Sequence, residues 1–215
     1  MGRIGVMLPR DLPANQVREY TVAVRTLLRG EPGPAAGRYV DVEGVVIGEV
    51  PQTVPPVVLG VRGPKSIALA GQVSDGVLLA EPSAPAYVAG SVARLASVSP
   101  EVITYDAAAV GDDGRKARDL ARPGLAWVGE PDWAPHLASL PFAGDLAAHR
   151  RKSASPEEFA ATMPDEWVRE LSLAGTPDEV RDRIAARHGA GATSVVLIPA
   201  EADRFEALTG LASAR

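Results

Sequence analysis

Cysteine is absent from the 215 residues, and aromatic residues make up only 5% of them. The lack of cysteine excludes a disulfide framework, a thiolate metal site and a cysteine nucleophile. Three histidines, scattered along the chain, are too few for a histidine-rich metal centre. The core must therefore be built from aliphatic side chains, and any metal or thiol chemistry is set aside.

Positive charge is also scarce, with 22 Lys and Arg against 27 Asp and Glu and a net charge of -5. This balance excludes the basic surface typical of nucleic-acid-binding proteins. No apolar run reaches the ~18–20 residues of a membrane span, and Met1-Gly2-Arg3 does not open a signal peptide. We predict a cytoplasmic protein that acts on a small molecule and has neither a nucleic-acid nor a membrane partner.

The hydrophobic content of 46% suits one α/β domain spanning residues 1–215. Short β-branched runs alternate with helical stretches, a pattern typical of βαβ units and a parallel sheet. The near-continuous apolar character of these runs indicates strands that are buried on both faces. We expect five main strands, near residues 3–8, 56–61, 76–80, 101–105 and 194–198.

Helices are predicted between and after these strands, at residues 15–30, 64–73, 83–97, 113–128, 176–188 and 201–213. Residues 130–173 contain only helical pieces broken by prolines, with no strand signal. Residues 38–50 hold two short β-prone runs around Glu43-Gly44 and are predicted to form a hairpin.

The segment Gly60-Val61-Arg62-Gly63-Pro64-Lys65-Ser66 follows a predicted strand and opens a helix. This position is the carboxyl end of the sheet, where α/β proteins bind ligands. The first amides of the helix lack intrahelical partners, two glycines allow close approach, and Arg62 and Lys65 add positive charge. The segment is either a phosphate-binding cradle or an ordinary strand-to-helix turn with exposed basic residues, and the residues alone leave both open.

Other polar residues favour structural roles. Asp75 precedes a strand, at its amino end, and is interpreted as a turn residue. The histidines (His136, His149 and His188) do not follow strand ends, and the tryptophans (Trp127, Trp133 and Trp167) are more typical of helix packing than of a ligand site. Gly175-Thr176-Pro177 begins a capping box with Glu179 and is interpreted as structural. The catalytic residues stay unknown.

Three segments carry a family resemblance. Residues 54–80 (VPPVVLGVRGPKSIALAGQVSDGVLLA) resemble the fifth-to-sixth-strand segment of the bacterial luciferase-like oxidoreductases, which are TIM-barrel enzymes. Residues 173–199, with the sequence LAGTPDEVRDRIAARHGAGATSVVLIP, are similar to the closing unit of that family. Residues 5–13 resemble its opening strand, and residues 18–39 resemble the helix and loop before its fifth strand.

The resemblance implies a cofactor, either reduced FMN or the 8-hydroxy-5-deazaflavin coenzyme. It assigns the cofactor phosphate to Gly60, Val61, Arg62, Gly63, Pro64 and Lys65. It also implies that the ~100 residues carrying the second to fourth strands of the barrel have no counterpart here, because Pro13 leads almost directly into the helix at residues 15–30. The chain is thus expected to be a single shortened domain.

The implied fold is an incomplete TIM-barrel-like arc of about five parallel strands with outer helices, ordered five, six, seven, eight, one. Open edges of such an arc invite pairing, so we expect closure by a homodimer or by the hairpin at residues 38–50. The implied function is a flavin- or deazaflavin-dependent oxidoreductase or monooxygenase with a remodelled site. The alternative is a non-catalytic flavin-binding or partner protein that has lost the redox activity.

Overall fold

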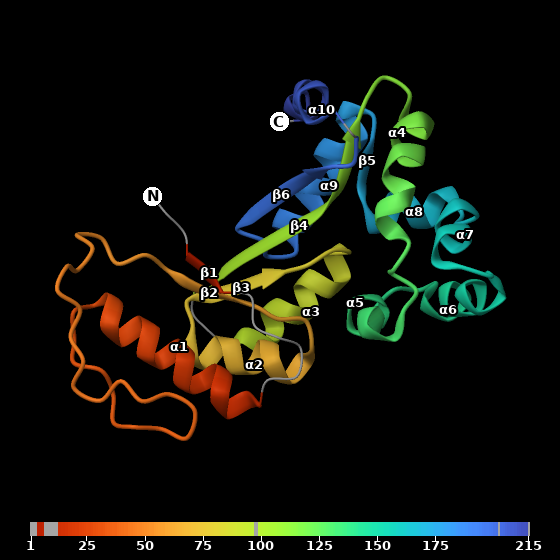
Figure 1. Ribbon diagram of the computed structural model, residues 1–215. Coiled ribbons are helices and arrows are strands. Elements are labelled where there is room, and N and C mark those ends of the chain that lie inside the picture. The colour runs from red at the N-terminus through yellow and green to blue at the C-terminus, as the bar shows by residue number, and fades with distance from the viewer. Residues whose placement is uncertain (1–3, 7–12, 97–98, 202, 215) are drawn as a thin grey trace. The chain divides into compact units, whose positions relative to one another are not determined.

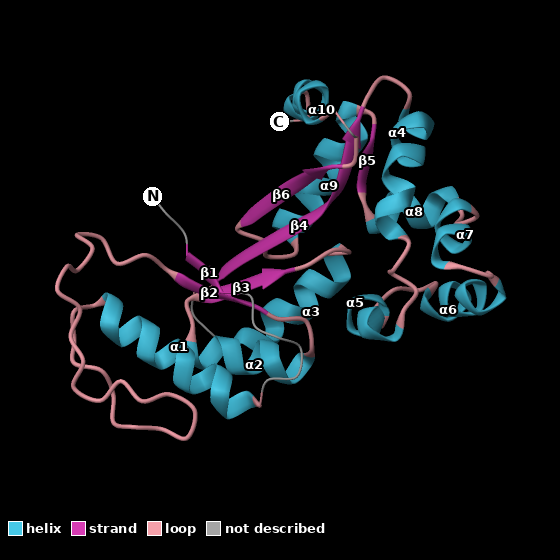
Figure 2. Cartoon of the chain, in the orientation of Figure 1, coloured by secondary structure: helices cyan, strands magenta, loops and turns pink. Residues whose placement is uncertain are grey.

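The computed structural model describes residues 4–6, 13–96, 99–201 and 203–214 (Figure 1). The chain divides into two compact units, one of residues 1–78 with 93–102 and the other of residues 79–92 with 103–215. Parallel strands and helices build both units (Figure 2). The α/β class predicted from the alternation of strand and helix signals is confirmed.

Three parallel strands form the sheet of the first unit: β1 (Ile4–Val6), β2 (Val57–Gly60) and β3 (Gly76–Leu79), paired in that order. The β-branched run of β2 is buried at its first three positions, as expected for a strand covered on both faces. In the register of β2 with β3, Gly60 lies opposite Leu78. The carboxyl ends of these two strands therefore lie side by side.

Two helices of the first unit, α1 (Ala14–Leu28) and α2 (Pro64–Val73), run side by side (Figure 1). The side chain of Arg18 donates to Gln72 Oε1 over 2.6 Å, and Arg25 Nη1 donates to Val73 O over 2.9 Å. The buried face of α2 supplies apolar core residues, namely Ile67, Leu69, Ala70 and Val73.

The second unit is built around β4 (Glu101–Val110), which pairs in parallel with β5 (Leu173–Gly175) and with β6 (Ser194–Pro199). Helices α9 (Pro177–Gly189) and α10 (Arg204–Ala212) share an apolar core with one face of these strands. Helix α4 (Gly114–Ala121) packs against Ala109 and Ala174 through small side chains. Helix α3 (Pro85–Leu95) follows β3.

Short helices occupy the stretch predicted to lack strands, which is confirmed for residues 130–172. They share one apolar cluster centred on fully buried Phe159 and Leu146. In chain order the helices of this stretch and the turn before it are η1 (Arg122–Leu125), η2 (Pro131–Trp133), α5 (Ala134–Leu137), α6 (Ala143–Lys152), α7 (Pro156–Ala161) and α8 (Asp165–Leu171).

Two expected boundaries are corrected. The strand expected at 101–105 continues to Val110, because Asp106, Ala108 and Ala109 are buried in it although they carry little strand signal. The helix expected at 113–128 ends at Ala121, where Pro123 turns the chain into the 3-10 helix η1. All five expected strands form within the described residues, together with the short sixth strand β5; the outer residues of the first one, 3 and 7–8, lie outside the described part.

The predicted hairpin at residues 38–50 is wrong. This segment contains no strand, and it folds back on the preceding loop, where Gly33 N donates to Val45 O over 2.8 Å and Gly44 N donates to Gly33 O over 3.2 Å. The carboxylate of Glu19 on α1 accepts from the N–H groups of Tyr39 and Val40. Glu19 of α1 and the loop itself satisfy these backbone groups, so they are not available for the hydrogen bonds of a hairpin.

The expected strand order is also wrong for β1. We expected the opening strand beside the last one, but β1 pairs with β2, with Ile4 opposite Val57 and Val6 opposite Leu59. No strand forms between residues 13 and 56 of the described chain, so no segment there occupies the edge of β2. That edge is where β1 pairs.

Among the described residues, the helices are all too short or too polar to cross a membrane.

The carboxylate of Asp75 joins the amino ends of the strands in the first unit. Its Oδ2 accepts from the N–H of buried Val57 over 2.8 Å, and its Oδ1 pairs with Arg25 of α1 over 2.5 Å. Its backbone bonds Val57 O and the N–H of Glu101. The interpretation of Asp75 as a structural turn residue agrees with these contacts.

We expect Asp75→Ala to lower the free energy of unfolding by about 1–3 kcal/mol, because the buried N–H of Val57 loses its acceptor. Urea denaturation followed by circular dichroism measures the change. The control is Asp178→Ala, which removes an ion pair whose carboxylate is 89% exposed and should change the stability by less than about 0.5 kcal/mol. Equal losses in the two variants would contradict this role for Asp75.

Candidate functional site

The turn from β2 into α2 forms as the sequence predicts. Gly60 ends the strand, Gly63 is the N-cap with φ -85° and ψ 154°, and Pro64 begins the helix. Proline has no N–H and its fixed φ suits the first helical position. Among the residues that the structure describes, no side chain caps α2: the hydroxyl of Ser66 donates to Gly63 O over 3.0 Å instead of accepting from an amide. Ile67 N donates to Gly63 O over 2.9 Å, which leaves the N–H groups of Lys65 and Ser66 for an anion.

The two glycines of this turn leave open space beside the helix start. A Cβ at Gly60 would meet no heavy atom within 4 Å, and one at Gly63 would meet only Ser66 Oγ, at 3.5 Å. Elsewhere in the same unit, a Cβ at Gly76 would lie 1.9 Å from Glu101 O. Packing thus requires glycine at 76, whereas at 60 and 63, at the carboxyl end of β2, the space beside the backbone is open.

Positive charge lies along this turn. Arg62 is half-buried in the turn and Lys65 is exposed in the first turn of α2. The six residues that the sequence assigns to the cradle, Gly60, Val61, Arg62, Gly63, Pro64 and Lys65, form one continuous turn. Helix amides, open space and cationic side chains together fit the phosphate of a cofactor.

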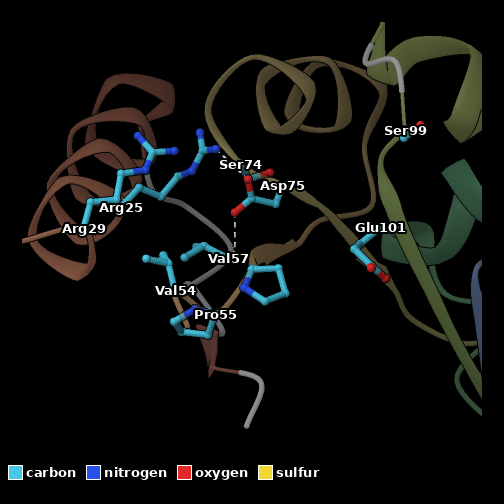
Figure 3. A pocket seen from close by; sticks show the side chains of 10 residues that line it. Arg25, Arg29, Val54, Pro55, Val57, Ser74, Asp75, Ser99 and Glu101 are labelled. Atoms are coloured by element: carbon cyan, nitrogen blue, oxygen red, sulfur yellow. Dashed lines mark hydrogen bonds and ion pairs between the residues drawn. The ribbon is translucent and has the colours of Figure 1, made fainter. Parts of the chain in front are cut away.

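A cavity of about 490 Å³ lies at the opposite, amino ends of the same strands (Figure 3). Arg25 and Arg29 reach into it from α1, beside Asp75. Asp75 and Arg25 are already engaged in holding β2 and α1 in place. In α/β barrels the amino ends of the strands serve stability and the carboxyl ends serve catalysis, so the turn, and not this cavity, lies at the end of the strands where such barrels bind ligands. The lining residues are Arg25, Arg29, Val54, Pro55, Pro56, Val57, Ser74, Asp75, Ser99 and Glu101.

Each histidine has a structural contact. His136 is fully buried, with Nδ1 3.1 Å from Pro82 O and its ring stacked on Tyr87. His149 Nε2 lies 3.1 Å from Thr162 Oγ1, and His188 Nδ1 lies 2.8 Å from Ala192 O. Within the described part of the chain, His, Asp and Glu residues form no group able to hold a metal ion.

Two of the three tryptophans are also engaged in packing. Trp133 donates its indole N–H to Glu81 O over 3.1 Å, and the ring of Trp167 stacks on Phe142 with centroids 5.3 Å apart. Trp127 is 57% exposed. The preference for helix packing over a ligand site agrees with the contacts of Trp133 and Trp167.

The start of α9 is occupied by its own capping box. Thr176 Oγ1 accepts from Glu179 N, and the Glu179 carboxylate accepts from Thr176 N over 2.8 Å. Arg118 and Arg169 also pair with this carboxylate, at 3.3 and 3.6 Å. Because the protein already satisfies this helix start, Gly175-Thr176-Pro177 is not an anion site, in agreement with its structural interpretation.

The model of the luciferase-like monooxygenase family matches residues 1–194 of the chain. The chain belongs to the luciferase-like monooxygenase family. Among the curated relatives of this luciferase-like protein are two 5,10-methylenetetrahydromethanopterin reductases. The protein of Archaeoglobus fulgidus is 27% identical over 212 residues, which cover 90% of this chain and 62% of that protein. The protein of Methanolobus tindarius is 27% identical over 199 residues, which cover 86% of this chain and 60% of that protein.

Solved structures share the fold. The coenzyme F420 dependent tetrahydromethanopterin reductase from Methanopyrus kandleri superimposes with a TM-score of 0.71 at 23% identity, covering 91% of this chain and 60% of that one. The oxygenating constituent of 3,6-diketocamphane monooxygenase from Pseudomonas putida, in complex with FMN, gives a TM-score of 0.54 at 16% identity, covering 92% and 60%. The expected luciferase-like architecture is confirmed, and the chain spans about three-fifths of the length of these relatives.

One polar network was missed by the sequence analysis. Asp106 on β4 and Arg187 on α9 are both fully buried and form an ion pair, with Nε 3.0 Å from Oδ2. Ser83, in the loop after β3, bonds the same carboxylate. The only available signal was an isolated aspartate between apolar residues of a strand, which does not reveal a partner 81 positions away.

The capping carboxylate makes the stability of this luciferase-like protein depend on pH. The backbone N–H of Thr176 holds the pKa of Glu179 below its usual range; burial opposes this, and Arg118 and Arg169 reinforce it. A lowered folded-state pKa contributes stability above the unfolded value of about 4.3, and this is lost as the pH falls through the folded value. Glu179→Gln should therefore flatten the loss of stability below about pH 4.3, measured by urea denaturation across the acid range. Asp178→Asn, which removes a charge from the same helical turn, is the control and should leave the slope nearly as steep as in the unmodified protein.

Proposed function

We propose that this luciferase-like protein is an oxidoreductase that binds the 8-hydroxy-5-deazaflavin coenzyme, with FMN as the second choice, and holds the cofactor phosphate at residues 60–65. The open space at Gly60 and Gly63 beside a helix start that lacks a side-chain cap among the described residues is the observation that carries the proposal. The names of similar solved structures support the choice of cofactor. Two of them state dependence on coenzyme F420, which is the 8-hydroxy-5-deazaflavin coenzyme, and another states a complex with FMN.

Both cofactors carry a phosphate group on a ribityl chain, so one cradle suits either of them. The N–H groups of Lys65 and Ser66 would donate to phosphate oxygens, and Arg62 and Lys65 would neutralise their charge. When bound, the cofactor supplies the hydride chemistry, and the protein supplies binding and orientation. The substrate is proposed to be a small molecule.

A shortened barrel is part of the proposal. We propose that the second to fourth strands of the family have no counterpart here, and the 62% and 60% coverage of the two reductases described above supports this. If the cofactor binds but is not reduced or oxidised by any substrate, the non-catalytic flavin-binding alternative is preferred.

A second copy of the chain is proposed to complete the open sheet. In the second unit, Val196 and Ile198 of β6 are 45% and 42% exposed, although their neighbours Val195 and Leu197 pack into the core. Among the described residues, β6 pairs with β4 alone. An unpaired strand edge with exposed apolar side chains is a template for association with another chain.

Cofactor binding is tested by titrating the protein with each cofactor and following absorbance and fluorescence. We expect micromolar binding of at least one and a loss of affinity of about tenfold or more in Arg62→Ala and in Lys65→Ala, because each removes a charged phosphate contact. Gly60→Val should fold normally, since its side chain meets open space, but should weaken binding strongly by occupying the space proposed for the phosphate. Gly48→Val, at another glycine with open space around it, is the control. Binding that none of the three cradle variants changes would remove the assignment.

Dimer formation is tested by sedimentation of the 22.4 kDa chain. We expect a species of twice this mass that Val196→Glu converts to monomer, because a carboxylate is introduced into an apolar contact. Val46→Glu is the matched control, since Val46 is 55% exposed but lies in a loop of the first unit. A compact monomer of the unmodified protein would refute the dimer.

A further inference from the structure

The loop after β3 is buried, although most loops run over the protein surface. Pro82 is buried, and Ser83 and Ala84 are fully buried. Burial of a loop leaves backbone polar groups that no helix or ladder satisfies, and each of them requires a partner. In this loop the partners are side chains from three later elements of the second unit.

Two aromatic side chains satisfy the carbonyl groups of the loop. The indole N–H of Trp133 donates to Glu81 O over 3.1 Å. Nδ1 of His136 lies 3.1 Å from Pro82 O, and because a carbonyl oxygen only accepts, Nδ1 is the donor. The His136 ring is fixed by stacking on Tyr87 with centroids 4.3 Å apart. Both carbonyl groups are therefore held by side chains with restricted positions.

The carboxylate of Asp106 holds the other side of the loop. Its Oδ1 accepts from Ser83 N over 2.8 Å, and its Oδ2 accepts from the Ser83 hydroxyl over 2.5 Å. Oδ2 also accepts from Arg187 Nε over 3.0 Å, while Arg187 Nη1 bonds Arg183 O on α9. Asp106, Ser83 and Arg187 are all fully buried. Both oxygens of the Asp106 carboxylate thus accept from Ser83. Arg187 neutralises the negative charge of this carboxylate.

A buried ion pair is a costly way to stabilise a fold, since apolar residues of similar volume often do as well or better. The pair instead provides directional hydrogen bonds. The two bonds from Ser83 to the Asp106 carboxylate restrict the loop to one conformation. The loop begins two residues after Leu79, at the carboxyl end of a parallel strand, which is where α/β proteins bind ligands. Binding surfaces of this kind depend on support from buried residues behind them.

We propose that Asp106 and Arg187 are positioning residues, which act through Ser83 to hold the loop at residues 81–84 in one conformation, and thereby keep the carboxyl end of β3 ordered for a ligand. The identity of the ligand rests on the proposed function. The role of Asp106 and Arg187 in holding the loop does not depend on it. Loss of the hydrogen bonds between Asp106 and Ser83, here called the clamp, should release the loop first. Weaker ligand binding should follow from the release of the loop.

The test uses Ser83→Ala, which removes one hydroxyl bond and leaves the ion pair intact. Hydrogen–deuterium exchange read by mass spectrometry should show about tenfold faster exchange in peptides covering residues 80–88, since one hydrogen bond of ordinary strength is lost. Affinity for the bound cofactor should fall by a similar factor. Asp106→Asn, a second variant, should release the same peptides further.

Ser172→Ala is the matched control. Ser172 is also fully buried, and its hydroxyl donates over 2.7 Å to Val168 O, a carbonyl of α8 and not of the loop. A merely structural role for Ser83 predicts equal effects of the two variants on cofactor affinity at equal loss of thermal stability, and that result would overturn the proposal. Unchanged exchange at residues 80–88 in both Ser83→Ala and Asp106→Asn would also overturn it. If the unmodified protein binds neither cofactor, the proposed function fails, and the exchange measurement alone decides whether the clamp positions the loop.

Discussion

The carboxylate of Asp75 sets the register on which the candidate site depends. It accepts from Val57 N and pairs with Arg25, so it fixes the start of β2 against α1 and against the segment leading into β3. Parallel strands are paired residue by residue through evenly spaced hydrogen bonds, so the register fixed at their amino ends also determines which residues lie side by side at their carboxyl ends. Gly60 consequently lies opposite Leu78, and the turn into α2 opens at the edge of the sheet where ligands bind.

Carboxylates perform the same task in the second unit, but inside the protein. Asp106 of β4 accepts hydrogen bonds from Ser83 in the loop after β3, and Arg187 of α9 neutralises its charge. Both side chains of this ion pair are fully buried. Glu179 closes the start of α9 and is paired with Arg118 and Arg169. The chain has few aromatic residues to define a core by shape, and its alanine-rich strand β4 packs through small side chains. Buried polar pairs supply a directionality that such a core lacks.

The glycines show how chemistry and packing are separated along one chain. At Gly76 a side chain would collide with Glu101 O, so glycine is required by the fold. At Gly60 a side chain would meet nothing, so the fold does not require glycine there. The phosphate site proposed for this turn depends on that open space.

The sequence by itself determined the α/β class, the main strands, the helical stretch between residues 130 and 172, and the turn at residues 60–65. These depend on local signals: β-branched runs, prolines, and glycines between a strand and a helix. Only the tertiary structure decided that β1 pairs with β2, that residues 38–50 form no hairpin, and that β4 extends through Asp106. These outcomes depend on partners that are far away in the chain. Glu19 satisfies the backbone of Tyr39 and Val40, and Arg187 makes an aspartate acceptable inside a strand. No local pattern encodes such pairings, because a residue's own propensity does not specify which distant group will satisfy its hydrogen bonds or its charge.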